Sequence, residues 1–362
     1  MVLIWCSISS HGFGHAAQVV PVLNELGRQI PGLKAILRTT LPAGIFQDWL
    51  QIPWELSEGE QDVGCRQQGP LVIDVPATWA AHLDFHRTWE KRLEAETEAI
   101  RSRAPALVLT DISHLAAAAG ARAGVRTVGL CNLSWDTVLE RYRERDRRDH
   151  LETIRLIRQA YDVVDLLIRP APCLPLPAFR RIRDINPIAC PQAPDKSALR
   201  SMIGAQPGES TVLIGFGGIA LNQLPYEQLE SLAGYRFLVF GPVPSGLLRV
   251  HQATPSPPHA FRSRLASADL LVTKPGYNTV VEAVASGVPV VYVRRFNFAD
   301  EQSLVDYLHH YGRTVELPRA DFDAGRWSDA LDKIQKAPSP AEAPPAPTGA
   351  SEAADILTGF LR

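Results

Sequence analysis

The stretch 269–302 constrains the fold more than any other part of the chain. It contains a short apolar strand (270–273), a break at 274–276, a helix (278–286) and a second apolar strand (290–293). This order predicts a parallel strand–helix–strand unit with a glycine-containing turn at the carboxyl end of its first strand. Such a turn directs backbone N–H groups and the positive end of a helix dipole at one place, where a phosphate can bind.

The same order occurs elsewhere in the chain. An apolar run at 2–7 leads into the turn SHGFGH (10–15) and a helical pattern at 17–29, and the run 211–216 leads into Gly217 and Gly218. Strands alternate with helices through both halves, which predicts an α/β fold with two doubly wound parallel sheets. The charged stretch 77–103 is typical of one long helix, whereas 42–75 shows no clear periodicity.

The length of 362 residues suits two domains better than one. Seven prolines between 170 and 194 exclude a regular helix there. We therefore expect an N-terminal domain over 1–190, an interdomain linker over 191–208, a C-terminal domain over 209–336, and a Pro-rich linker with a final helix over 337–362.

Charge and cysteine content limit the partners and the compartment. The net charge of −2 creates no global field that would attract nucleic acid or an acidic membrane. Five cysteines without a C-x-x-C pair favour reduced thiols over disulfides or zinc. The chain begins directly with a strand rather than a signal peptide, and no apolar run approaches the roughly 20 residues that a membrane span needs. We predict a soluble, cytoplasmic protein.

Two segments resemble a known family. Gly14-His15 after the first strand looks like the acceptor-side turn of GT-B glycosyltransferases. The words KPGYNT (274–279) with Glu282, and then DEQ (300–302), are similar to their donor-side signature. The lipid II-forming N-acetylglucosaminyltransferase has this layout. The glycosyltransferase-like N-terminal half of plant L-arabinokinases is closer in wording, with an H/D-G-F-G-H turn and a V-R-R before the acidic loop. The resemblance implies two Rossmann-like domains that face a cleft, an acceptor-binding one and a nucleotide-sugar-binding one.

On the acceptor side, the resemblance implies that His15 is the general base. A neutral imidazole at pH 7 can take the proton of a hydroxyl as its oxygen attacks the anomeric carbon. Asp111 ends the predicted strand 107–111 and is the candidate to orient the ring, although it could instead cap the next helix. His11 is an alternative base, and the rest of the acceptor-side turn is Gly12, Phe13 and Gly14.

On the donor side, the glycine turns allow the backbone to approach a diphosphate closely. By the resemblance, Glu282 would accept hydrogen bonds from ribose hydroxyls, but T-x-x-E at 279–282 also fits a capping box. Phe261 could pack on the base or in the core. The expected donor-binding residues are Gly217, Gly218, Lys274, Gly276, Tyr277, Asn278, Thr279, Glu282, Arg294, Arg295, Asp300, Glu301 and Gln302.

Cations of this set would neutralise the leaving diphosphate, which this fold normally does without metal. Lys274 is one candidate, and Arg294 and Arg295 are the others. Two adjacent side chains on a strand point to opposite faces, so we expect only one of the arginines to serve. We predict no metal and no cofactor besides the nucleotide-sugar co-substrate, and we attribute the D-x-D word at 321–323, in a predicted loop, to chance.

The sequence thus favours a glycosyltransferase of the hexosyltransferase type, inverting and metal-independent. It would move a sugar from a nucleotide-diphosphate sugar, with UDP favoured, to a hydroxyl of a small-molecule or glycan acceptor. Retention of configuration, hydrolysis of the nucleotide sugar, epimerisation at C2 and non-catalytic binding are open alternatives. We expect no nucleic-acid partner and no membrane partner.

Overall fold

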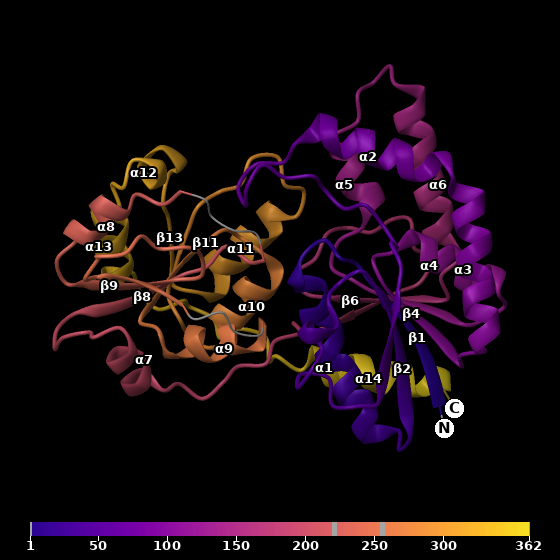
Figure 1. The fold of residues 1–362 in the computed structure, drawn as a ribbon, viewed down its shortest axis with the longest axis horizontal. Coiled ribbons are helices and arrows are strands. Elements are labelled where there is room, and N and C mark those ends of the chain that lie inside the picture. Colours follow the sequence, from indigo (N-terminus) through magenta and orange to yellow (C-terminus); the bar gives the residue numbers. More distant parts are fainter. Residues whose placement is uncertain (1, 219–222, 254–257, 362) are drawn as a thin grey trace. The chain divides into compact units, whose positions relative to one another are not determined.

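The computed structural model describes residues 2–218, 223–253 and 258–361, and it divides into two compact units (Figure 1). Unit 1 comprises Met1–Arg66, Ile73–Ile188 and Pro347–Arg362, and unit 2 comprises Gln67–Val72 and Ala189–Ala346. Each unit has its own sheet and its own apolar clusters.

The sheet of unit 1 is parallel throughout, as predicted. Its strands lie in the order β3-β2-β1-β4-β5-β6-β7. Most of their residues are buried because helices cover both faces. The strands are β1 (Val2–Ile8), β2 (Leu33–Thr39), β3 (Trp54–Glu58), β4 (Leu107–Asp111), β5 (Thr127–Leu130), β6 (Leu166–Pro170) and β7 (Ile182–Ile185).

Helices α1 and α14 cover one face of this sheet, and α3, α4 and α6 cover the other (Figure 1). The prediction of one helix over 77–103 is wrong, because the backbone of Thr88 leaves the helical region (φ −110°, ψ 25°) and separates α2 from α3. The helices of unit 1 are α1 (Phe13–Gln29), the 3₁₀ turn η1 (Ala43–Ile45), α2 (Val75–Arg87), α3 (Trp89–Arg103), α4 (His114–Arg122), α5 (Trp135–Arg141), α6 (Arg148–Asp162) and α14 (Gly349–Leu361).

The sheet of unit 2 is also parallel, in the order β10-β9-β8-β11-β12-β13. Its strands are β8 (Ser210–Ile214), β9 (Tyr235–Val239), β10 (Val250–Gln252), β11 (Leu270–Thr273), β12 (Val290–Tyr292) and β13 (Thr314–Glu316). The helices are α7 (Lys196–Met202), α8 (Tyr226–Ser231), α9 (Pro258–Ser267), α10 (Tyr277–Ala285), α11 (Glu301–Tyr311), α12 (Arg319–Asp323) and α13 (Ser328–Lys336).

The predicted linker over 191–208 differs from the structure. It carries α7, which is anchored in unit 2 by the ion pair between Lys196 Nζ and Asp269 Oδ1 (2.9 Å) and by the bond from Asp195 N to Ser267 Oγ (2.9 Å). The change of unit falls at Ile188 and Ala189. A seven-residue helix in which only Leu199 is buried gave no periodic signal that would separate it from a linker.

The C-terminal helix packs back on unit 1. Leu357 of α14 is fully buried in the same cluster as Val19 and Leu23 of α1, and Gln29 of α1 bonds to Thr358 Oγ1 (2.8 Å). Conversely, one short segment from the first half of the chain packs on unit 2. Leu71, in the short segment that unit 2 takes from the first half of the chain, is buried in the core of unit 2, and its carbonyl accepts from Phe296 N (2.9 Å).

Both sheets reverse their strand order once, in unit 1 between β1 and β4 and in unit 2 between β8 and β11. At such a point the loops after the two strands diverge, and a ligand can bind at the carboxyl edge of the sheet. Ile8 at the end of β1 pairs with Asp111 at the end of β4, and Ile214 at the end of β8 pairs with Val272. The two reversals are therefore the expected positions of ligand-binding sites.

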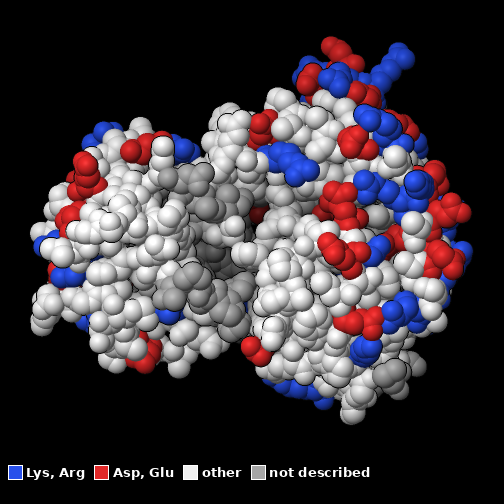
Figure 2. Space-filling model, in the orientation of Figure 1, with Lys and Arg blue, Asp and Glu red and all other residues white. Residues whose placement is uncertain are grey.

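The outer surface shows no field of one sign on the face seen in Figure 2, where acidic and basic side chains alternate over the helices of unit 1. Within the described ranges, no helix combines the length and the apolar character that crossing a bilayer requires.

Candidate functional site

The strand reversal of unit 1 holds an imidazole–carboxylate pair. His15 lies in the first turn of α1, which begins after Gly12 (φ 114°), and Asp111 is the last residue of β4. His15 Nδ1 lies 3.1 Å from Asp111 Oδ1 and 2.9 Å from Oδ2. Because a carboxylate only accepts, Nδ1 carries the proton and Nε2 keeps its lone pair. The His15 side chain is 16% exposed and that of Asp111 1%, so the imidazole alone reaches solvent.

The alternative that Asp111 caps the following helix is wrong. Helix α4 is capped by Ser113, whose Oγ accepts from Ala116 N (3.2 Å). The carboxylate of Asp111 contacts His15 instead of a helix N-terminus.

His11, the alternative base, is held differently. Its Nε2 accepts a hydrogen bond from Cys65 N (3.3 Å), and the edge of its ring meets Trp135 with centroids 5.6 Å apart. A β-carbon on Gly64 (φ 68°) would lie 2.2 Å from His11 Nδ1, so glycine is needed there for both backbone and space. Phe13 of the same turn is 38% exposed.

Asp62, in the segment 59–66, lies in this part of unit 1 and was not predicted from the sequence. Asp62 is 4% exposed; its Oδ1 accepts from Ser9 Oγ (3.0 Å) and its Oδ2 from Trp135 Nε1 (2.9 Å). Burial raises the pKa of Asp62 to about 6, although Trp135, the nearby His15 and Ser9 act in the opposite direction. The signal was available in outline, since Ser9 and Asp62 both follow the carboxyl ends of parallel strands, where sites form.

The strand reversal of unit 2 holds a lysine between two glycine turns. A β-carbon placed on Gly217 (φ 75°) would lie 3.7 Å from Lys274 Nζ, and one placed on Gly276 would lie 3.5 Å from it. The two turns are tied together by Thr273 Oγ1, which donates to the carbonyl of Gly215 (2.6 Å). Gly217 and Gly218 are exposed. This arrangement concentrates positive charge and backbone N–H groups, which suits an anion.

The pKa of Lys274 lies close to neutral pH. Burial and the neighbouring Arg295 lower its pKa to about 7, although Asp300 and Glu301 act in the opposite direction. A bound anion would favour the ammonium form and reverse this shift.

The two arginines after β12 point apart, as predicted. Arg295 is buried with its guanidinium 3.0 Å from Asp300 Oδ1, while Arg294 bonds to Gln302 Oε1 (3.2 Å) at the surface. Burial raises the pKa of Asp300 and of Glu301, whose Oε1 accepts from Arg295 N. The predicted sugar-binding carboxylates are thus engaged by the inward arginine, and Gln302 is the exposed member of the three.

Glu282 lies on α10 but is not part of a capping box. The helix is capped by Gly276 without a side-chain bond, so that alternative is wrong. Glu282 Oε1 instead contacts Arg262 Nε (2.8 Å) and accepts from Cys190 N (3.0 Å). Its Oε2 is buried and has no hydrogen-bond partner among the described residues. Burial raises the pKa of this carboxyl.

Other predicted residues divide between site and core. The Tyr277 side chain is buried in the apolar core, so only its backbone could meet a ligand, and Asn278 and Thr279 are half-buried in the first turn of α10. Phe261 packs on Phe240 in that core. The D-x-D word lies in α12 rather than in a loop, and its aspartates pair with Arg319 and Arg326. No cluster of three or more potential metal ligands occurs in the described ranges.

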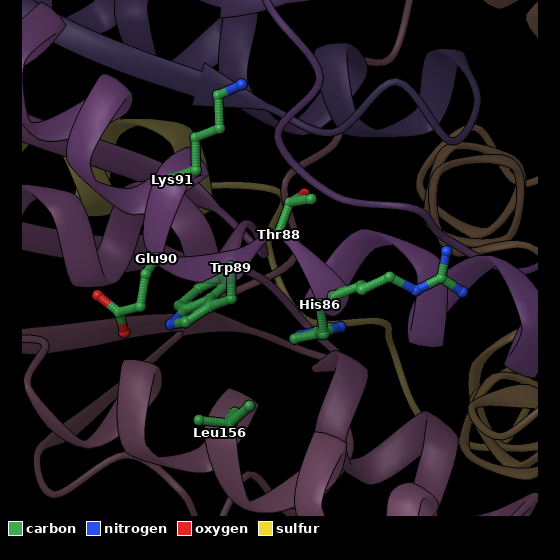
Figure 3. Close-up of a pocket in the computed structure, with 7 residues that line it drawn as sticks. His86, Thr88, Trp89, Glu90, Lys91 and Leu156 are labelled. Atoms are coloured by element: carbon green, nitrogen blue, oxygen red, sulfur yellow. The ribbon is translucent and has the colours of Figure 1, made fainter.

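A pocket of about 490 Å³ opens elsewhere in unit 1, at the break between α2 and α3 (Figure 3). Its lining includes His86, Trp89 and Leu156, together with the charged side chains of Glu90 and Lys91. His86 Nε2 lies 3.1 Å from His114 Nε2. The pocket is shallow and contains none of the residues predicted for catalysis or donor binding.

The chain matches no known protein-family profile. It is 28% identical to the L-arabinokinase of Arabidopsis thaliana over 333 residues, which make up 90% of this chain but 31% of the kinase, so the chain spans about a third of that relative.

Solved structures match along the whole chain. UGT2 of Phytolacca americana in complex with UDP-2fluoro-glucose and pterostilbene has a TM-score of 0.63 at 15% identity, with 100% of this chain and 94% of that chain covered. A UDP-glucosyltransferase of Polygonum tinctorium scores 0.63 at 14% identity (99% and 98% covered), and the kitacinnamycin glycotransferase 0.62 at 17% (99% and 99%). The fold is GT-B. In this structure the His15–Asp111 pair lies at the carboxyl edge of the first sheet, and the turn that contains Lys274 follows β11 of the second sheet.

The dependence of His11 on Gly64 can be tested by stability. We expect Gly64→Ala to lower the free energy of unfolding by about 2–5 kcal/mol, because a left-handed backbone costs an alanine about 1–2 kcal/mol and the collision with His11 adds about 1–3 kcal/mol. Gly124→Ala is the matched control, since Gly124 has φ 75° and open space around it. Urea unfolding would measure both, and equal losses would contradict the packing of His11 on Gly64.

Proposed function

We propose that this GT-B protein is a glycosyltransferase that moves a sugar from a UDP-sugar to a hydroxyl of a small-molecule acceptor, with inversion and without a metal. The observation that carries the proposal is the His15–Asp111 pair, which leaves an imidazole lone pair at a strand reversal. The likeness to UGT2, solved with UDP-2fluoro-glucose and pterostilbene, supports a UDP-sugar donor and a small-molecule acceptor. Free cysteines support a reducing cytoplasm as the compartment.

In the proposed reaction His15 is the general base. The acceptor oxygen attacks the anomeric carbon while its proton passes to His15 Nε2, and the bond between that carbon and the phosphate oxygen breaks. Asp111 holds the ring in the tautomer with the proton on Nδ1 and stabilises the imidazolium that forms. One displacement of this kind inverts the configuration.

The donor half of the proposal uses the turns of unit 2. Backbone N–H groups at Gly217, Gly218 and Gly276 would bind the diphosphate, and Lys274 would offset its charge as UDP leaves. The buried Oε2 of Glu282 suits a ribose hydroxyl, since a buried acceptor without a partner is costly. Gln302 would bind the sugar from the first turn of α11, next to Asp300, which Arg295 engages.

The direct test is His15→Ala. We expect turnover to fall by about 10²–10⁴-fold, as for the loss of a general base, while the Kd for UDP changes less than about twofold. UDP release from a panel of UDP-sugars, each with and without pterostilbene, would measure turnover, and calorimetry would measure UDP binding. His11→Ala is the comparison variant, and a loss confined to it would make His11 the base.

The same assay separates the rival functions. Free sugar that appears at an equal rate with and without acceptor would identify a hydrolase. Binding of UDP-sugars with no turnover in the unaltered protein would identify a non-catalytic binder.

Lys274 gives the donor site a pH dependence. With its pKa near 7, Lys274 is mostly neutral above that pH in the free protein, and binding of a diphosphate must restore its proton. We expect the affinity for UDP to fall by up to about tenfold per pH unit between pH 7.5 and 9, with uptake of about one proton per UDP at pH 8. The phosphates of UDP are fully ionised in this range, since their last pKa is about 6.

Calorimetry in two buffers of different ionisation heat measures that proton uptake. Lys274→Met should bind UDP weakly and without this pH dependence. An equal Kd at pH 7 and pH 9 in the unaltered protein would contradict the role of Lys274.

A further inference from the structure

Asp62 is a buried carboxylate whose two partners are both neutral. Ser9 Oγ donates to Oδ1 and Trp135 Nε1 to Oδ2, and all three side chains are almost fully buried. No lysine or arginine forms an ion pair with Asp62 in the described part of the chain. Burying a charge that only two neutral donors compensate costs free energy of folding. The carboxylate is therefore expected to serve a purpose other than stability.

Asp62 lies beside the proposed catalytic pair. Its partner Ser9 follows Ile8, which pairs with Asp111, and the carbonyl of the adjacent Gln61 accepts from Ser113 Oγ (2.9 Å), two residues past Asp111. The electrostatics agree with this placement, since His15 lowers the pKa of Asp62 and Asp111 raises it. The three groups come from three segments: the loop 59–66, the first turn of α1 and the end of β4. Ser9 and Trp135 fix the carboxylate from two further places, the end of β1 and the start of α5.

We propose that Asp62 is a second carboxylate for His15, held by Ser9 and Trp135, which stabilises the imidazolium that forms when His15 takes a proton. It is a positioning residue, because its oxygens are occupied and buried and it acts only through His15. The role as an aid to catalysis rests on the proposed function, but the electrostatic effect on His15 does not.

Few other groups compete for this role. Within the described residues, Asp111 contacts His15 directly and Asp62 interacts with it electrostatically, whereas the ring of His11 accepts from Cys65 N. Burial raises the pKa of the nearby thiols Cys6 and Cys131, so both are neutral at physiological pH. Two carboxylates therefore act on one imidazole, and transfer of a proton to Nε2 changes the net charge of the three groups from −2 to −1.

The site allows an isosteric test. In Asp62→Asn, the amide oxygen can accept from Trp135 Nε1, and the amide nitrogen can donate to Ser9 Oγ, which has a second lone pair besides the one that accepts from His11 N. The charge is removed while both contacts persist. Ser9→Ala is the matched control, because it removes one hydrogen bond to Asp62 but keeps the charge.

The measurement is a pH titration of His15 by ¹⁵N NMR on the full chain without substrate, with its signal assigned by its loss in His15→Ala. We expect the pKa of His15 to fall by about one unit in Asp62→Asn and by much less in Ser9→Ala. An unchanged His15 pKa in Asp62→Asn, or an equal fall in Ser9→Ala, would overturn the proposal in favour of a packing role. Failure of the glycosyltransferase assignment would appear separately, as absent turnover.

A second measurement needs no variant. If Asp62→Asn does not fold, the ¹³C carboxyl signal of Asp62 and the ¹⁵N signals of His15 in the unaltered protein decide the matter. Coupled groups should titrate in two shared steps, and each signal should report both. Independent single-step curves would overturn the proposal.

Discussion

The hydrogen bond between Asp111 and His15 is the interaction on which the proposed chemistry depends. It exists because β1 and β4 are neighbours in a parallel sheet whose strand order reverses between them. Ile8 and Asp111 are paired residues, and the chain needs only the short turn after β1 to bring the first turn of α1 over the end of β4. A buried carboxylate then fixes the ring, its tautomer and the direction of its lone pair.

Unit 2 uses the same topology for a different purpose. Where unit 1 places an imidazole, unit 2 places two glycine turns around Lys274. The ammonium is surrounded by Arg295 and by two carboxylates that Arg295 engages, so positive charge is kept close to an open turn at the cost of burying four charged groups. A buried ion cluster of this kind is weak evidence for stability, and under the proposed function its task is to bind the diphosphate.

The sequence predicted most of this framework because buried parallel strands leave continuous apolar runs, and glycine turns after them have few other uses. Strands 107–111, 127–130 and 270–273 could be located to the residue. Thr88 could not be foreseen as a break, because threonine is tolerated in helices and neither glycine nor proline marks the position. Asp62 stayed hidden because the loop 59–66 has no periodicity, and only the folded sheet brings it to His15 and Trp135. The sequence also did not show that the side chain of Tyr277, within the predicted binding motif, packs in the core.

The most direct measurement of the central claim is the tautomer of His15 in the resting protein, read from ¹⁵N–¹H correlation spectra of its ring at pH 8. If Asp111 accepts from Nδ1, the spectra will show a proton on Nδ1 and an unprotonated Nε2, and Asp111→Ala will abolish that preference. A proton on Nε2 in the unaltered protein would leave no lone pair for an acceptor hydroxyl and would contradict the account.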